Sequence, residues 1–174
     1  MAPLAEPQVF DPRYTRNPVA KRPFVQQLFT RIAPRYDWFN RLASLGLDQH
    51  WRKRVVSRAA LEPKHRVLDL CCGTGDLAIL CAAGPGRPNR LVGVDMTLAM
   101  LAVAQHKQKA RHLPIYWMQG DAEALPFPSG TFDRITIGFS TRNLSHLDLA
   151  LAEMVRVLRP CGKLLILETG YPSN

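Results

Sequence analysis

The chain has 174 residues, of which 47% are hydrophobic and 21% are charged, and this composition is typical of a single soluble globular domain. No apolar run approaches the ~18 residues that a membrane-crossing helix needs, so we do not expect such a helix. The formal net charge is +9, and residues 1–60 hold eleven Lys and Arg against four Asp and Glu, a bias that suits nucleic acid, an anionic membrane, an acidic substrate or a solvated helical face.

The N-terminal third is predicted to be an arm followed by helices. Residues 1–23 contain five prolines and little apolar periodicity, which predicts a flexible arm. They show no charged stretch followed by an apolar segment, so we expect no secretory signal and a cytoplasmic protein. From Phe24 onward apolar residues recur at helical spacing, and residues 24–62 are interpreted as three short helices with breaks near Pro34 and Gly46.

Residues 63–174 alternate between short apolar runs and helical stretches. Five runs are predicted to be strands, at residues 66–71, 90–95, 115–119, 132–139 and 163–168. Helices are predicted from about residue 76 onward, over 97–110 and over 145–158. Strands that alternate with helices imply right-handed βαβ units, and therefore an α/β fold with a mostly parallel sheet.

A glycine-rich turn follows the first predicted strand. Gly73 and Gly75 can adopt backbone angles that other residues avoid, and the N–H groups that open the next helix favour an anionic group. Ligands of open α/β sheets bind beyond the carboxyl ends of the strands, where this turn lies. The spacing Gly73-x-Gly75-x-x-Ala78 also fits the dinucleotide fingerprint, and a glycine turn that serves only packing is the alternative.

Three aspartates lie in or after the first three strands. Asp69, inside the first strand, can accept a hydrogen bond from a ligand ammonium or orient the glycine turn. Asp95 ends the second strand, where it can accept from ribose hydroxyls, and Asp121 follows the third, where it can accept from an adenine amino group. Each has a structural alternative: a turn cap, a helix N-cap and a loop closure, respectively. Their order along the strands favours a nucleoside ligand.

The four cysteines show neither CxxC spacing nor neighbouring histidine clusters. Metal or disulfide frameworks normally need such spacing. We therefore interpret them as reduced thiols that serve as small packing residues and expect no metal; they are Cys71, Cys72, Cys81 and Cys161.

The combination of glycine turn and strand-end aspartates resembles the class I methyltransferases that use S-adenosylmethionine. Four stretches narrow the resemblance to the ubiquinone and menaquinone biosynthesis C-methyltransferase family: YDWFNRLASLGLDQHW (36–51), DAEALPFPSGTFDRITIGF (121–139), TRN (141–143) and RVLRPCGKLLILE (156–168). The similarity runs from about Val19 to Glu168. It implies a Rossmann-like sheet and S-adenosylmethionine as cofactor, without metal, bound by Asp69, Gly73, Thr74, Gly75, Asp95, Met96, Asp121, Ala122 and Gly138.

The resemblance also implies a reaction, the methylation of a ring carbon of a prenylated quinol. Demethylmenaquinol would become menaquinol, or the equivalent ubiquinone precursor would be methylated. Proton removal or ring positioning would fall to Tyr36, Asp37, Asn40, Arg142 and Asn143. A helix-boundary cluster is the alternative for the first three, and His50 is interpreted as a packed or solvated histidine. Arg142 has three candidate partners: the cofactor carboxylate, a quinol oxygen or Asp148.

The chain departs from the family pattern in places. It has Cys161-Gly162 where the family usually has Gly-Gly, and Thr169-Gly170 where it usually has Phe-Ser; Asp48 lies where a histidine is common. Class I methyltransferases normally add two strands after the fifth, so we expect a core that lacks its C-terminal strands. An open sheet edge would then be covered by a partner or by a second copy in a homo-oligomer.

The N-terminal helices of residues 24–62 are expected to cover the substrate. Their apolar stripe and basic flank would also rest peripherally on the inner face of the membrane, where a prenyl tail resides, although plain core packing is the alternative. Two rival functions are a nucleic-acid or other small-molecule methyltransferase and a truncated, non-catalytic cofactor-binding module. Nucleic acid is not expected as a partner, because GFSTRN follows the fourth strand rather than Asn/Asp-Pro-Pro-aromatic.

Overall fold

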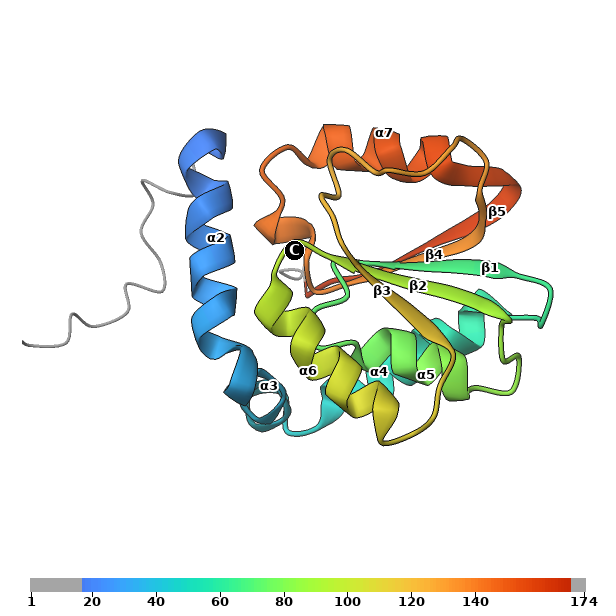
Figure 1. Ribbon diagram of the computed structural model, residues 1–174, viewed down its shortest axis with the longest axis horizontal. Coiled ribbons are helices and arrows are strands. Elements are labelled where there is room, and N and C mark those ends of the chain that lie inside the picture. The colour runs from blue at the N-terminus through green and yellow to red at the C-terminus, as the bar shows by residue number, and fades with distance from the viewer. Residues whose placement is uncertain (1–16, 170–174) are drawn as a thin grey trace, which may run out of the picture.

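A computed structural model describes residues 17–169 (Figure 1). Within these residues three α-helices precede the first strand, as the sequence predicts for 24–62: α2 (Pro18–Ile32), α3 (Tyr36–Ala43) and α4 (Leu47–Ala59). A short 3-10 turn, Ala33–Arg35, joins the first two, and Gly46 adopts a φ of 80° before α4. The chain therefore breaks near Pro34 and Gly46, where breaks are predicted.

Helix α2 begins earlier than the sequence suggests. Asn17 caps it, because the Asn17 Oδ1 accepts a hydrogen bond from the Val19 N–H at 3.1 Å, and Pro18 occupies the first helical turn, where proline is tolerated. The prediction of an arm over residues 1–23 is therefore wrong for residues 18–23, which are helical although Pro23 lies inside the helix. The rest of the predicted arm, residues 1–16, lies outside the described residues.

Five strands form one sheet in the order β3-β2-β1-β4-β5, and every pairing is parallel. The strands are β1 (Arg66–Leu70), β2 (Arg90–Asp95), β3 (Ile115–Gln119), β4 (Phe132–Gly138) and β5 (Leu158–Leu167). This confirms the α/β, Rossmann-like fold class. The chain moves outward from β1 to β3 and then returns to the other side of β1 with β4. The order thus reverses between β1 and β4, and ligands of such sheets bind at the carboxyl ends beside this reversal.

The fifth strand differs from the prediction at its start. It begins at Leu158 rather than at residue 163, and RPCG lies inside it as an irregularity. Phe132 pairs with Leu158 whereas Arg134 pairs with Lys163, and Cys161 has a φ of 63°. The extra residues bulge out of the ladder, so the sequence reads as a turn although the chain remains paired with β4 on both sides.

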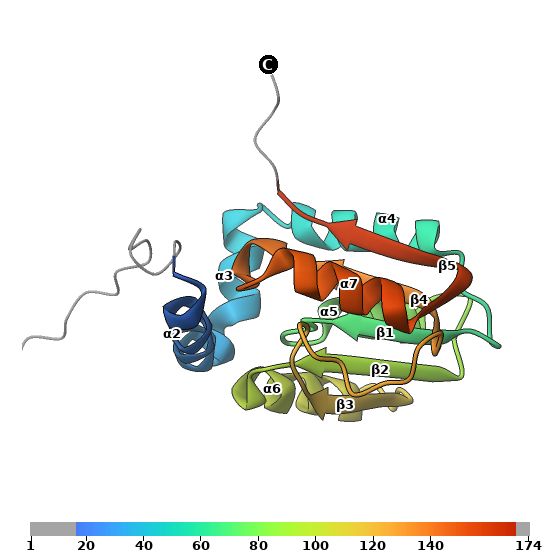
Figure 2. The ribbon, with the colours of Figure 1, turned by 90° about the horizontal axis from the view of Figure 1, so that it is seen from above.

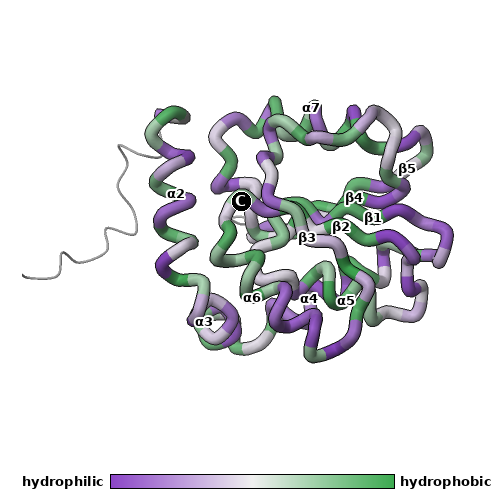
Figure 3. Tube along the Cα trace, in the orientation of Figure 1, coloured by the Kyte–Doolittle hydropathy of each residue, from purple (hydrophilic) through white to green (hydrophobic). Residues whose placement is uncertain are grey.

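Helices cover both faces of the sheet (Figures 1 and 2). Helices α4, α5 (Asp76–Ala83) and α6 (Leu98–Lys109) lie on one face, and α7 (Leu147–Val157) lies on the other. Alternation along β1 sends Leu68 and Leu70 into the core under α7, and Val67 into the core with Cys81 of α5. Hydrophobic residues gather in the central strands (Figure 3). Within the described part of the chain, every helix is too short or too polar to span a bilayer.

Helix α2 stands across the carboxyl ends of the strands rather than against a sheet face (Figures 1 and 2). Its contacts run to α6 and to the 3-10 turn that follows it. The N-terminal segment therefore closes the edge of the sheet at which the topology places a ligand.

A buried carboxylate joins β1 to its neighbours. Asp69 is 1% exposed; its Oδ2 accepts from the Ala78 N–H at 3.0 Å, and its Oδ1 accepts from the Thr136 hydroxyl at 2.7 Å. One side chain thus ties β1 to α5 and to β4. Burial raises the pKa of Asp69 to about 7, although the hydrogen bond from Thr136 opposes the rise.

Asp69 makes stability depend on pH. The folded carboxyl keeps its proton up to about pH 7, whereas the unfolded carboxyl releases it near 3.8, so its stabilising contribution is complete below pH 3.8 and is lost as the pH rises through 7. We expect the unfolding free energy of the wild type to fall relative to Asp69→Asn by roughly 1 kcal/mol per pH unit across that window. Urea denaturation at several pH values measures the difference. Parallel pH curves for the two proteins would show that Asp69 does not hold this proton.

Candidate functional site

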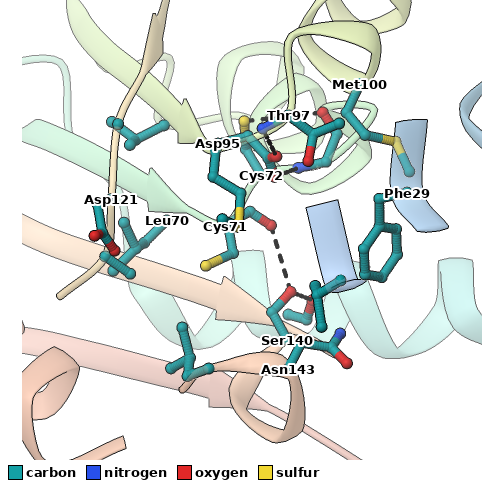
Figure 4. Close-up of a pocket in the computed structure, with 18 of the residues that line it drawn as sticks. Phe29, Leu70, Cys71, Cys72, Asp95, Thr97, Met100, Asp121, Ser140 and Asn143 are labelled. Carbon is teal, nitrogen blue, oxygen red and sulfur yellow. Dashed lines mark hydrogen bonds between the residues drawn. The ribbon is translucent and has the colours of Figure 1, made fainter. Parts of the chain in front are cut away.

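A cavity opens where the strand order reverses (Figure 4). The strand ends and the segments that leave them form its walls: residues 70–74 at the end of β1, 94–97 at the end of β2, 120–123 after β3, and Gly138 and Ser140 at the end of β4. Helix α2 supplies a further wall with Val25 and Phe29. The cavity therefore draws together segments that are far apart in the sequence.

Most of the residues predicted to bind a cofactor line this cavity. They are Gly73, Thr74, Asp95, Met96, Asp121, Ala122 and Gly138. Of the residues predicted to act on the substrate, Tyr36 and Asn143 line it as well. The other predicted site residues lie outside its lining: Asp69, Gly75, Asp37, Asn40 and Arg142.

Asp95 fastens the glycine loop to the end of β2. Its Oδ2 accepts from the Gly73 N–H and its Oδ1 accepts from the Thr97 N–H, both at 2.8 Å. Thr97, not Asp95, is the N-cap residue of α6, so the helix-cap alternative does not describe it. Burial raises the pKa of Asp95, and the two backbone hydrogen bonds oppose that rise. Each carboxylate oxygen has a second lone pair, so Asp95 retains acceptor capacity at the cavity wall.

Asp121 holds both its own loop and helix α2. Its Oδ1 accepts from the Glu123 N–H at 3.0 Å, which is the loop closure named as the alternative, and its Oδ2 forms an ion pair with Arg22. Arg22 also lies 3.9 Å from Glu123. Two further contacts hold α2: the Lys21 Nζ donates to the Leu144 carbonyl at 2.6 Å, and the Gln26 Nε2 donates to the Met96 carbonyl at 3.1 Å. The helix is thereby pinned on both sides of the cavity.

A polar cluster lies beneath the glycine loop. Lys107 of α6 forms ion pairs with Asp37 of α3 and Asp76 of α5, and the Thr74 hydroxyl donates to Asp37. Burial alone would raise the pKa of Asp76, but the charge and hydrogen bond of Lys107, the charge of Arg52 and the hydrogen bond from Gln49 together lower it. Asp37 is therefore engaged in docking α3 onto the loop.

The remaining predicted substrate residues differ in position. Tyr36 packs edge-on against Phe29 with ring centroids 5.7 Å apart, and both rings line the cavity. Asn40 is half-buried on α3, and His50 is exposed on α4. Arg142 forms an ion pair with Glu168 rather than with Asp148, a partner that no local pattern around Arg142 indicates.

Several residues that line the cavity are not predicted from the sequence to do so. Cys71 and Cys72 were expected only to pack, yet both lie in the wall, and Figure 4 shows Ser140 donating to the Cys71 carbonyl. Burial raises the pKa of both thiols well above the ordinary value, so they remain protonated. Their place directly before the glycine loop was the signal. Phe29 and Arg22 gave no comparable signal, because a helical stripe does not reveal what it covers.

Comparison with known proteins agrees with the resemblance in the sequence. The model of the ubiE/COQ5 methyltransferase family matches residues 17–174. A 2-phytyl-1,4-naphtoquinone methyltransferase from Synechocystis sp. is 44% identical over 152 residues, which are 86% of this chain and 64% of that protein. A demethylmenaquinone methyltransferase from Thermus thermophilus is 47% identical over 148 residues, 84% of this chain and 66% of that protein. The chain thus spans slightly under two thirds of the length of these relatives.

Solved structures share the fold. The YcgJ protein from Bacillus subtilis aligns with a TM-score of 0.64 and 32% identity, over 68% of this chain and 50% of that one. A putative methyltransferase from Bacillus halodurans aligns with a TM-score of 0.65 and 28% identity, over 71% of this chain and 52% of that one.

Two glycines of the loop provide a test of where the cavity lies. Both have positive φ, but a Cβ added at Gly75 would lie 2.5 Å from the ring of Trp117 and 3.0 Å from Ala104, whereas one added at Gly73 would meet nothing within 4 Å. The Trp117 ring cannot move freely, because its Nε1 donates to Gln108. Gly73→Ala should therefore cost only backbone strain, about 1 kcal/mol, and Gly75→Ala about 3 kcal/mol once overpacking is added. Urea denaturation measures both costs, and equal values would contradict the open space at Gly73.

Proposed function

The chain belongs to the ubiE/COQ5 methyltransferase family, and from this we propose that it transfers the methyl group of S-adenosylmethionine to a ring carbon of a prenylated quinol. The observation that carries the proposal is the convergence of the glycine loop, Asp95 and Asp121 on one cavity. Their order follows β1, β2 and β3, which suits a ligand that lies across the strand ends.

We assign the cofactor contacts as follows. Gly73 and Thr74 would seat the methionine part, because no side chain fills the space over Gly73. The free lone pairs of Asp95 would accept from the ribose hydroxyls. Asp121 would accept from the adenine amino group, which requires Arg22 to share or release its carboxylate. Asp69 would act indirectly by orienting the loop, since Ala78 and Thr136 occupy its oxygens.

When bound, S-adenosylmethionine supplies an electrophilic methyl group, so the chain has to bind, orient and exclude water. Tyr36 and Asn143 are the predicted substrate residues that reach the cavity, and we propose that their phenol and amide orient the quinol oxygens. Phe29 and Val25 offer an apolar wall for the ring. Asp37, Asn40 and Arg142 would support this arrangement from outside the lining.

The substrate class follows from the relatives. The two relatives carry names that refer to demethylmenaquinone and to a 1,4-naphthoquinone, so we propose a naphthoquinol in preference to a benzoquinol. Residues 24–62 would cover the substrate, with the cover beginning at Pro18, and residues 63–174 would form the cofactor-binding core.

Methyl transfer can be measured directly. Incubation with labelled S-adenosylmethionine and short-chain demethylmenaquinol should place the label in the lipid extract, as mass spectrometry detects, and the benzoquinol analogue should be labelled more slowly.

Asp95→Asn should reduce cofactor affinity about tenfold, because one acceptor is lost. Cofactor binding without transfer to either quinol would instead favour a binding module, and a salt-dependent affinity for RNA or DNA would favour a nucleic-acid enzyme.

We further propose that the protein is cytoplasmic and contacts the membrane peripherally, through the outward face of α3. Large apolar side chains on and just after this helix are exposed: Trp38 at 67%, Phe39 at 61%, Leu42 at 58% and Leu45 at 87%. Helical spacing places Trp38 and Leu42 on one stripe, Leu45 follows the end of the helix, and Asp37 points inward to Lys107. Arg31, Arg35 and Arg41 are exposed along the same segment, which gives the apolar face a positively charged border that suits anionic lipid.

The membrane contact is tested by vesicle flotation. The double variant Trp38→Ser/Phe39→Ser should lose most of its binding to phosphatidylglycerol-rich vesicles, because Trp and Phe supply the buried apolar area. Tyr116→Ser is the matched control, since Tyr116 is 69% exposed on β3. Equal vesicle binding by both variants would refute the proposed membrane face. It would also be refuted if the wild type did not bind vesicles and formed a dimer that the double variant lost.

Assembly is the remaining proposal. Among the described strands β5 pairs only with β4, and Ile166 on it is 47% exposed. A free strand edge attracts another strand. We propose that a partner segment or a second copy of the chain covers it.

A further inference from the structure

Within the described residues 17–169, an arginine in the cavity wall is buried without a hydrogen bond. Arg52 of α4 is 8% exposed and lines the cavity, and its Nε has no hydrogen-bond partner. Asp48 forms an ion pair with Arg52, although its Oδ2 lies 3.6 Å from that Nε, beyond hydrogen-bonding distance. No hydrogen bond joins the other guanidinium nitrogens to a residue in the 17–169 range. A guanidinium has five N–H donors, and buried donors in folded proteins are normally paired.

Packing nevertheless fixes this guanidinium in place. Its central carbon lies 5.0 Å from the centre of the Phe139 ring, which in turn packs against Trp51 at 6.2 Å. Its Nη1 lies beside the end of β4, since a Cβ added at Gly138 would be 3.6 Å from it. The donors are therefore held rigidly at the cavity wall.

Neighbouring acidic groups offset the charge of Arg52, but within residues 17–169 none of them accepts a hydrogen bond from it. Asp48 already accepts from the Ser44 hydroxyl and the Gln49 amide, and Asp76 is paired with Lys107. Asp69 accepts from Ala78 and Thr136. Each nearby carboxylate has other donors, so the guanidinium retains capacity for an anion that enters the cavity.

We propose that Arg52 is an anion-binding subsite that takes the carboxylate at the amino-acid end of the ligand. This rests on the proposed function. The site features follow the strand order: Asp121 after β3, Asp95 at the end of β2, Gly73 after β1 and Arg52 beside β4. Three strand spacings cover roughly 14 Å, a length that an extended adenosyl amino acid can span. The planar fork of arginine suits a carboxylate, which can accept two parallel hydrogen bonds.

Binding of paired ligands tests the assignment without catalysis. Calorimetry would compare S-adenosylhomocysteine with 5′-methylthioadenosine, which lacks the amino-acid end. Arg52→Met should lower the affinity for S-adenosylhomocysteine about 10- to 100-fold. It should change the affinity for methylthioadenosine less than about twofold, because only the ligand with a carboxylate loses charged hydrogen bonds. Arg52→Lys, which keeps the charge but not the fork, should fall between. Arg54→Met is the matched control, since Arg54 is exposed on the same helix.

Other outcomes would decide against the subsite. If Arg52→Met lowered the affinities for both ligands equally, Arg52 would have a packing role only. If neither affinity changed, Arg52 would have no role in binding. For the wild type, decarboxylated S-adenosylmethionine should bind about tenfold or more weakly than S-adenosylmethionine, and equal binding would overturn the proposal even if no Arg52 variant folds. Failure of the wild type to bind any adenosyl ligand would refute the proposed function itself. The thermal midpoint of Arg52→Met without ligand should fall, because Asp48, which is 4% exposed, loses the cation with which it forms an ion pair.

Discussion

The site depends on one hydrogen-bonding arrangement, in which the Asp95 carboxylate accepts hydrogen bonds from the backbone of two segments. Its oxygens accept from Gly73 and Thr97, so a single side chain at the end of β2 fixes the loop that follows β1 and the start of α6. The glycine loop has few side chains to pack, and positive φ at Gly73 and Gly75 makes it costly to form without such support. Asp69 supplies the same kind of support one layer deeper, through Ala78 and Thr136.

The sequence was informative where chemistry repeats along the chain. The alternation of strands with helices predicts the parallel sheet. Asp95 and Asp121 are predicted from polar residues at the ends of apolar strands, and both line the cavity. Local rules failed where the deciding partner is distant. Lys107 meets Asp37 across seventy residues, and no periodicity encodes that contact. Likewise the Glu168 partner of Arg142 depends on how β5 lies beside β4, which only the assembled sheet determines.

The positive charge of the N-terminal segment serves more than one purpose. Arg22 and Lys21 are used internally, to hold α2 over the cavity, and Arg52 is buried against Phe139. Arg31, Arg35 and Arg41 remain exposed beside the apolar face of α3. A net-charge count cannot separate these groups, because it does not distinguish a buried cation from a solvated one. The distinction follows from helix geometry, which turns successive residues of one segment toward the cavity or toward solvent.

Strand order also gives the cavity an electrostatic direction. Carboxylates follow β2 and β3, whereas the buried guanidinium of Arg52 lies beside β4, on the other side of the point where the order reverses. A ligand that donates hydrogen bonds at one end and carries an anion at the other is therefore favoured in a single orientation. The reverse orientation would place its anion near Asp95 and Asp121 and leave Arg52 without a hydrogen-bond acceptor from the ligand. A symmetric dinucleotide offers no such polarity, so the arrangement favours an adenosyl amino acid over the dinucleotide that the glycine spacing also permits.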